Sequence, residues 1–491
     1  MEKNTVTINK KLITTKKVLE VSGDIIVPDI KPDIVSIINT NGIPYIYKED
    51  VGTGRVRFDG NIDSFVVYLA DNGETRSIGA SLSFSDSIEN TLIKETSFSK
   101  QQIHLENIEA KVLNERKISI KANLKVTLEV FEKEEVEITS DFNELGGIEK
   151  LKETVTIKSI VGTNKIKTSI KEDISVDNSF SVAEILKTNV EIGNLENKIS
   201  YNKVLAKADA EVKIVFLSED GRIGVASSNI PVMSFIDVEK VTDGHECQVE
   251  YMIKNMVFKV NSKEMHSITC QIEFEVLCSV FENKTIDVIQ DMYGIKNSLE
   301  FSKKEIEVPV FLESSNEKIS ISEKIQVEDI LNVLDVNTHF RKVNSTKSGN
   351  MYNSECEASL DIFYEADNRN GLNIKSITIP FMVKQENDEE IDFEISNKQF
   401  TVSAENVNCN MEILLKNNRD SMKKISVIDN VECKDCDQED DYKMFLYFVK
   451  PGDTIWNIAK RFKVCSDDII AMNKIENKDK INVGDRLYIM R

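Results

Sequence analysis

Long runs of strict apolar–polar alternation constrain the fold of this chain most. The run KISIKANLKVTLEVF (117–131) places apolar or small residues at every second position and polar residues between them. The run SITCQIEFEVLCSVF (267–281) repeats this pattern 150 residues later, and NVNCNMEILL (406–415) is a shorter third copy. Alternation of this length is typical of antiparallel strands with one buried and one solvated face. The chain is therefore predicted to be mainly β.

A hairpin pattern recurs with nearly the same period. Alternating strands at 60–74, 207–222 and 355–371 each run into a turn that contains Asp-Gly or Asn and Gly. The glycines of these turns are separated by 148 and 150 residues: Gly73, Gly221 and Gly371. Such turns need a positive φ, so they favour β-hairpins. Repetition at this distance indicates tandem domains and not a solenoid of small repeats.

A third element precedes each hairpin by about 35 residues. It comprises KPDIVSIINTNG (31–42), VAEILKTNVEIG (182–193) and VEDILNVLDVN (327–337). Acidic residues precede apolar residues at helical spacing, which predicts one short helix per unit. We therefore expect three tandem antiparallel β-sandwich or barrel-like domains with short helices, at residues 10–150, 151–300 and 301–416.

The tandem units resemble SPOCS domains, a class found in clostridial sporulation proteins. The resemblance is carried by VPDIKPDIVSIIN at the head of the first unit and by apolar patterns over residues 10–415. The Pro-Asp helix start is clear only in the first unit, because Ala183-Glu184 and Glu328-Asp329 take its place in the others.

Residues 417–444 are polar and acidic without a sustained period, which predicts a flexible linker. Cys433 and Cys436 form a CxxC pair within it. One interpretation is half of a zinc site or a redox pair, and the other is a pair of solvated linker thiols. Nearby residues supply no second CxxC or histidine, so neither a metal nor a cofactor is predicted.

The last 47 residues form a separate pattern. FLYFVK (445–450) predicts a strand, TIWNIAKRF (454–462) and DDIIAMN (467–473) predict helices, and RLYIM (486–490) predicts a closing strand. Asp453 or Thr454 is expected to cap the first helix and Ser466 the second. Residues 445–491 are thus predicted to be a small β-α-α-β domain.

This tail closely resembles a LysM domain. The matching residues are Tyr447, Val449, Pro451, Gly452, Asp453, Thr454, Trp456, Ile458, Ala459, Phe462, Val464, Ile469, Asn473, Ile475, Asn477, Ile481, Gly484, Leu487 and Ile489. LysM domains bind glycans that contain N-acetylglucosamine, such as peptidoglycan. The resemblance places the ligand- or partner-binding groove at Gly452, Asp453, Thr454, Ile455, Trp456, Asn477, Lys478, Ile481 and Asn482. Lys478 stands where a proline is common in the family.

Two of these residues have more than one interpretation. Trp456, the single tryptophan of the chain, could stack on a sugar or anchor a protein contact, or it could pack between the helices and the sheet. Asn473 is interpreted as a helix C-cap or structural amide and not as a ligand.

Charge divides the chain into two parts. The formal charge is −21, and residues 445–491 contribute +3, which leaves −24 for residues 1–444. This balance argues against nucleic-acid binding. The N-terminal sequence has no apolar signal region, and no apolar stretch has the length of a membrane span. We therefore expect a cytoplasmic protein without a transmembrane segment.

Signals of catalysis are poor. The four histidines are scattered, and the chain has no HExxH, GxSxG or GxxxxGK[ST] motif. The hairpin-turn aspartates suit the turn geometry, with calcium binding as the alternative: Asp71, Asp220 and Asp367. Cys270 and Cys278 lie on the inward face of a strand pattern and are predicted to be core residues. No catalytic residue is predicted, and the protein is not expected to be an enzyme.

The combination of SPOCS-like units with one C-terminal LysM resembles the SipL group of clostridial spore-coat morphogenetic proteins. In that group the LysM domain binds the coat morphogenetic ATPase. The resemblance implies a spore-coat assembly scaffold in the mother cell, at the forespore surface. The alternative is a peptidoglycan-binding protein anchored through its LysM domain.

Overall fold

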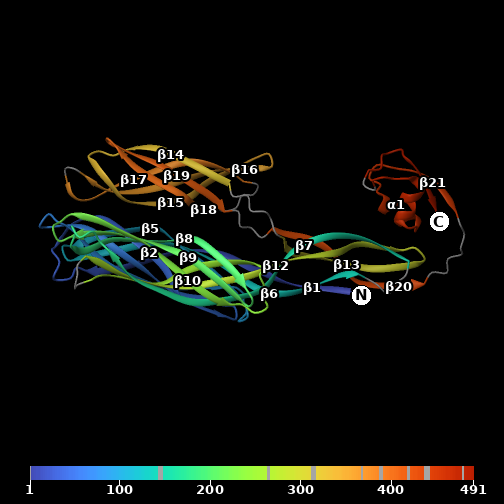
Figure 1. Cartoon of the computed structure of the whole chain (residues 1–491), viewed down its shortest axis with the longest axis horizontal. Coiled ribbons are helices and arrows are strands. Elements are labelled where there is room, and N and C mark those ends of the chain that lie inside the picture. The colour runs from blue at the N-terminus through green and yellow to red at the C-terminus, as the bar shows by residue number, and fades with distance from the viewer. Residues whose placement is uncertain are drawn as a thin grey trace.

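The computed structural model describes residues 2–141, 147–261, 266–310, 317–366, 369–385, 391–416, 421–435, 443–477 and 480–491. Strands dominate these residues, and the two helices found among them both lie after residue 454. Three β units of similar topology are followed by a small C-terminal domain (Figure 1). The mainly β fold with a small β-α-α-β domain at the C-terminus is confirmed.

The first unit has two three-stranded antiparallel sheets. Its strands are β1 (Glu2–Ile26), β2 (Ile34–Gly52), β3 (Arg55–Ala70), β4 (Thr75–Glu89), β5 (Phe98–Asn114) and β6 (Lys117–Asp141). One sheet has the order β1-β6-β5 and the other the order β2-β3-β4. The central strand β6 contains the alternating run 117–131, which explains its buried inward face.

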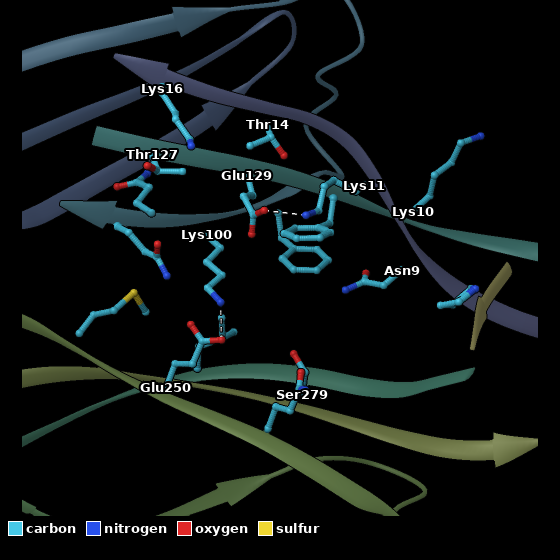
Figure 2. Close-up of a pocket in the computed structure, with 18 of the residues that line it drawn as sticks. Asn9, Lys10, Lys11, Thr14, Lys16, Lys100, Thr127, Glu129, Glu250 and Ser279 are labelled. Carbon is cyan, nitrogen blue, oxygen red and sulfur yellow. Dashed lines mark hydrogen bonds and ion pairs between the residues drawn. The ribbon is translucent and has the colours of Figure 1, made fainter. Parts of the chain in front are cut away.

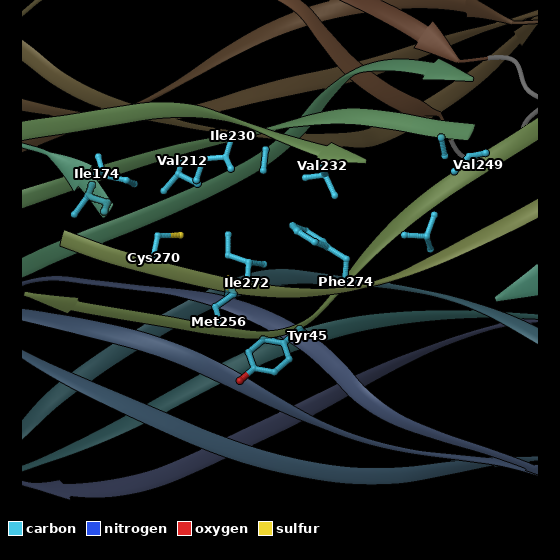
Figure 3. Close-up of a cluster of buried hydrophobic side chains, with 14 of the residues drawn as sticks. Tyr45, Ile174, Val212, Ile230, Val232, Val249, Met256, Cys270, Ile272 and Phe274 are labelled. Carbon is cyan, nitrogen blue, oxygen red and sulfur yellow. The ribbon is translucent and has the colours of Figure 1, made fainter. Parts of the chain in front are cut away.

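The second unit repeats this arrangement. Its strands are β7 (Ile148–Ser175), β8 (Val182–Ser200), β9 (Lys203–Ser218), β10 (Ile223–Asp237), β11 (Glu246–Val260) and β12 (Ser267–Gly294). The sheets have the orders β11-β12-β7 and β10-β9-β8. Figure 3 shows the core between them, where inward side chains such as Val212, Cys270 and Phe274 meet.

The third unit divides its first sheet into two parts. Its strands are β13 (Asn297–Val310), β14 (Glu317–Gln326), β15 (Ile330–Ser348), β16 (Met351–Ala366), β17 (Arg369–Gln385), β18 (Asp392–Ser403), β19 (Asn406–Lys416) and β20 (Ser421–Asp435). β14-β19-β18 and β15-β16-β17 are three-stranded, whereas β13 pairs with β20 alone. Gly371 lies within β17 and not in a turn, and the turn residues 367–368 are outside the described residues.

The prediction of a short helix in each unit is wrong. The three segments form the starts of strands β2, β8 and β15 instead. Each strand begins with two register shifts three residues apart, as at Val182/Glu184 and Ile185/Lys187 in β8, with equivalents in β2 and β15. Because each bulge inserts an extra residue, the buried apolar positions at the start of β8 become Val182, Ile185 and Leu186. Residues at positions i, i+3 and i+4 also share one face of a helix, which explains why the sequence predicted a helix here.

A stalk of three two-stranded ribbons extends from the units toward the C-terminal domain (Figure 1). The outer parts of β1 and β6, of β7 and β12, and the pair β13–β20 form the ribbons. Their inward side chains share one core: Val6, Ile8, Ile138, Val155, Ile157, Ile286, Val288, Val308, Ile425 and Val427. The predicted flexible linker is therefore wrong over residues 421–435, because β20 closes this core. Cys436 and the Cys433 side chain lie outside the described residues.

The three units meet at equivalent positions. Val67, Val215 and Phe363, which are 148 residues apart, belong to one buried cluster. Lys187 of β8 lies at this junction and forms an ion pair with Asp335 of β15, while both side chains are almost completely buried. Lys213 Nζ approaches the other Asp335 oxygen at 3.1 Å. The units are thus joined by an apolar cluster with a buried charge pair at its edge.

The core cysteines provide a test of this packing. Cys270 and Cys278 have no exposed surface, as predicted, and burial raises the pKa of each thiol to about 12. We expect both to resist alkylation by iodoacetamide at pH 8 at least about 100-fold more strongly in the native protein than in urea. Peptide mapping by mass spectrometry measures this, with Cys465, which is partly exposed, as the internal comparison. Equal rates at all three cysteines would contradict the packing.

Candidate functional site

The C-terminal domain has the predicted order of elements. It comprises β21 (Met444–Phe448), α1 (Ile455–Phe462), α2 (Ser466–Asn473) and β22 (Arg486–Met490). Gly452 provides the positive φ of +83° that the turn before α1 requires. Thr454 caps α1, since its hydroxyl accepts a hydrogen bond from the Asn457 N–H at 3.1 Å. Asp453 accepts instead from Tyr447 at 2.6 Å and from the Lys450 N–H at 2.8 Å, which fixes the turn.

The predicted cap of the second helix is wrong. Cys465 occupies the N-cap position of α2 without a side-chain hydrogen bond, and Ser466 is the first helical residue. The Ser466 hydroxyl donates to Glu149 of β7 at 3.0 Å. Ser466 therefore serves a contact with the stalk, which local sequence cannot reveal.

The predicted groove residues come from the two loops that flank the helices. Gly452, Thr454, Asn477 and Asn482 are exposed, Asp453 and Ile481 are partly buried, and Ile455 belongs to the core. Lys478 lies outside the described residues. Among the exposed members, small side chains and amides offer the donors and acceptors that acetamido groups need. Their role in binding stays a prediction.

Asn473 is the structural amide that the sequence predicted. Its Nδ2 donates to the Ile469 and Tyr488 carbonyls, both at 2.8 Å. Its Oδ1 accepts from the Tyr488 N–H at 2.7 Å. The side chain thus joins the end of α2 to β22.

Trp456 faces the stalk. It is partly buried, and its ring meets that of Tyr293 in β12 with centroids 4.9 Å apart and an interplanar angle of 61°. The indole N–H donates to Asp291 at 2.9 Å, and Lys460, one helical turn later, donates to both Asp291 oxygens at 2.7 Å. Of the alternatives for Trp456, packing holds: the side chain is partly buried against the core of the domain, and much of its environment comes from a different part of the chain.

Tyr293 completes this contact, which we call the stalk dock. Its side chain belongs to the buried core of the C-terminal domain, and its hydroxyl donates to the Val464 carbonyl at 2.8 Å. Asp291, Tyr293 and Glu149 were not predicted as site residues. The long alternation of β12 indicates a strand but says nothing of the domain that packs on its end, since the partner residues lie more than 160 positions away.

Opposing effects act on the Asp291 carboxyl. Partial burial alone would raise its pKa, but the hydrogen bonds from Lys460 and Trp456 and the charges of Lys460 and Lys303 hold the pKa below its ordinary value. A depressed pKa means that the ionised form stabilises the dock. This contribution is complete above the ordinary carboxyl pKa of about 4 and is lost as pH falls through the lower folded value.

Acidification is therefore expected to loosen the dock. As pH falls from about 5 to about 2, emission from Trp456 should shift to longer wavelength as Asp291 becomes protonated. The matched variant Asp291→Asn keeps the shape of the side chain but has no ionised form, and it should lack this component of the transition. An identical acid transition in both proteins would contradict the assignment to Asp291.

A cavity of about 2880 Å³ lies between the units and is lined by residues of all three. Figure 2 shows two ion pairs in it, Lys11 with Glu129 and Lys100 with Glu250. The second pair joins the first unit to the second at 2.7 Å. The ion pair between Lys100 and Glu250 thus contributes to the contact between the first and second units.

Neither a metal-binding cluster nor a membrane-spanning helix is found among the described residues. No group of three or more His, Cys, Asp and Glu side chains is arranged to hold a metal ion there. None of the helices in that part of the chain has the length and apolar character of a membrane span.

Comparison with known families matches two segments. Residues 447–489 match the LysM domain, and residues 181–261 match the SipL, SPOCS domain. The second match covers β8 to β11 of the second unit. No curated protein matches the chain. The two matches support a sporulation-related protein that carries a domain of the peptidoglycan-binding LysM class.

Proposed function

We propose that this chain, which has the SipL-type combination of a SPOCS domain and a C-terminal LysM domain, is a non-enzymatic assembly scaffold of the spore coat. Its LysM domain docks onto the coat morphogenetic ATPase at the forespore surface, on the mother-cell side. The three β units form the body of the scaffold, and other coat proteins are further partners.

One observation carries this proposal: the LysM domain is fixed to the end of the stalk. The stalk dock uses Trp456, Lys460 and Ser466 on one side of the domain. The exposed loops and the outer side of the β21–β22 sheet stay accessible among the described residues. A binding domain held on a rigid support loses less orientational freedom on complex formation than a tethered one. This arrangement suits a scaffold that must hold its partner in a defined position.

Charge supports the same division of roles. The LysM domain carries +3 and the rest of the chain −24. An acidic partner is therefore attracted to the domain and repelled by the units, which directs encounter to the end of the stalk.

Peptidoglycan binding is the second candidate, and the exposed groove loops favour it. Gly452, Thr454, Asn477 and Asn482 could receive an N-acetylglucosamine chain without displacement of the stalk. The scaffold role and the glycan role make different predictions for a direct binding measurement.

Titration calorimetry distinguishes the two roles. The full chain and a chain without residues 445–491 are each titrated with the coat morphogenetic ATPase and with soluble peptidoglycan fragments. The scaffold role predicts ATPase binding that is lost with residues 445–491 and no measurable glycan binding. Glycan binding by the full chain together with no ATPase binding would contradict it.

A further inference from the structure

The outer side of the β21–β22 sheet is apolar. The register pairs Met444 with Met490 and Leu446 with Tyr488. In each strand the alternate residues point inward and pack on the helices, including Tyr447 and Leu487. The outward residues form what we call the outer sheet face: Met444, Leu446, Phe448, Tyr488 and Met490, each between 48% and 68% exposed.

This exposure is unusual because five large apolar side chains lie next to one another. Single exposed apolar residues are common on protein surfaces, but a contiguous group on two paired strands marks an interaction surface. A β-sheet with one side in the core ordinarily places polar residues on the other side. The sequence of β21 and β22 departs from that rule at each of these five positions.

Other sides of the domain are less suitable for an apolar partner. The side with Trp456 and Lys460 is occupied by the stalk, and the exposed groove positions are glycine, threonine and asparagine. Within the docked domain, the outer sheet face therefore combines accessibility with apolar area among the described residues.

Basic residues border this face. Lys443 and Lys450 flank β21, and Arg486 begins β22, where its guanidinium lies 5.8 Å from the centre of the Phe448 ring. All three are exposed. Asp485, an acidic neighbour among the described residues, accepts hydrogen bonds from Asn482. The border therefore favours a partner with carboxylates around its apolar residues.

The same charges argue against two other occupants. A second copy would bring two basic borders together if it met this face with its own outer sheet face. An anionic membrane would repel the −24 of the remaining chain, which contacts the domain through the stalk dock.

We propose that the outer sheet face binds the protein partner of the LysM domain, through a segment of that partner that presents apolar side chains flanked by carboxylates. This inference rests on the proposed function and assigns the partner to a face different from the loop groove.

The test uses the full chain and the coat morphogenetic ATPase as the probe. The double variant Leu446→Ser/Tyr488→Ser removes apolar area at the centre of the face, and Asn457→Ser changes an exposed polar residue of α1 as the matched control. We expect at least about 100-fold weaker binding for the double variant, because central interface residues dominate affinity, and unchanged binding for the control. Arg486→Glu is expected to lower the association rate and its dependence on salt.

The outcomes separate failure of the inference from failure of the proposed function. No binding of the ATPase by the unaltered chain overturns the proposed function. Binding that the double variant retains, with an unchanged Trp456 emission spectrum in all proteins, overturns the inference alone. The last part of the test uses phosphatidylglycerol vesicles as the probe. If the double variant lost vesicle binding but kept ATPase binding, the outer sheet face would be a membrane contact, and the inference would be overturned.

Discussion

Replacing Asp335 with leucine is expected to destabilise the junction of the three units by about 3–5 kcal/mol, since it leaves the buried Lys187 ammonium without its carboxylate. Lys187 is 3% exposed in its side chain and lies 4.1 Å from the centre of the Phe363 ring. Burial lowers the pKa of Lys187, whereas the carboxylate of Asp335 opposes that effect. Without Asp335 the burial effect and the repulsion from Lys213 and Lys398 remain, and all of them lower the pKa of Lys187.

The double variant Lys187→Met/Asp335→Leu is the matched comparison. It removes both charges and replaces them with apolar groups of similar size, so its stability should lie close to that of the natural chain. Lys187→Met alone should cost less than Asp335→Leu alone, because Lys213 remains 3.1 Å from Asp335. Urea unfolding followed by circular dichroism, with hydrogen exchange of β8 and β15, measures these differences.

An exposed ion pair serves as the negative control. Asp237 and Lys203 lie 3.5 Å apart and are both highly exposed, so Asp237→Leu should change stability little. If Asp335→Leu changed the stability as little as Asp237→Leu, this would contradict the description of Lys187 and Asp335 as a buried charge pair at the junction of the three units.

Replacing Tyr293 with alanine is expected to release the LysM domain from the stalk. The variant removes a side chain from the core of the domain, the ring contact with Trp456 and the hydrogen bond to the Val464 carbonyl. Removal of a large buried aromatic side chain costs about 3–5 kcal/mol. The remaining polar contacts of Asp291 and Glu149 are partly exposed and cannot compensate for such a loss.

Trp456 reports the release directly, because it is the single tryptophan of the chain. Its emission should shift to longer wavelength, and its quenching by acrylamide should rise several-fold in Tyr293→Ala. Tyr201→Ala removes a tyrosine that is 77% exposed and distant in sequence, and it should leave both signals unchanged. Unchanged emission in Tyr293→Ala would mean that the dock does not depend on this ring.

The dock also affects how variants of Trp456 are interpreted. A charged substitution of Trp456 would disturb the contact with Tyr293 and Asp291 as well as any partner contact. Loss of partner binding in such a variant would not identify the binding face. Variants of the outer sheet face avoid this ambiguity, because their side chains point away from the core and the stalk.

Period-two alternation predicted the strands of the units because it reflects burial on one side. The inward residues of 117–131 and 267–281 are at most 1% exposed. The C-terminal domain was equally predictable except for the cap of its second helix, since its turn, the cap of its first helix and its apolar spacing are local. Alternation failed where the β-bulges of β2, β8 and β15 shifted the apolar positions to helical spacing.

Contacts between distant segments could not be predicted from the sequence. β20 looked like part of a polar and acidic linker because its sequence has no sustained apolar period, yet Ile425 and Val427 complete the stalk core. Asp291 and Tyr293 gained their roles only through a domain that follows them by more than 160 residues. For the predicted groove, the structure shows which of the described residues are exposed. The identity of the molecule that binds them stays a prediction.

The localisation of a fluorescent fusion in sporulating cells tests the central claim most directly. The full chain is compared with a chain that ends before residue 445. The proposed scaffold predicts that the full chain surrounds the forespore and that the shortened chain spreads through the mother cell. Forespore localisation that is independent of residues 445–491 would contradict the claim and assign recruitment to the three β units.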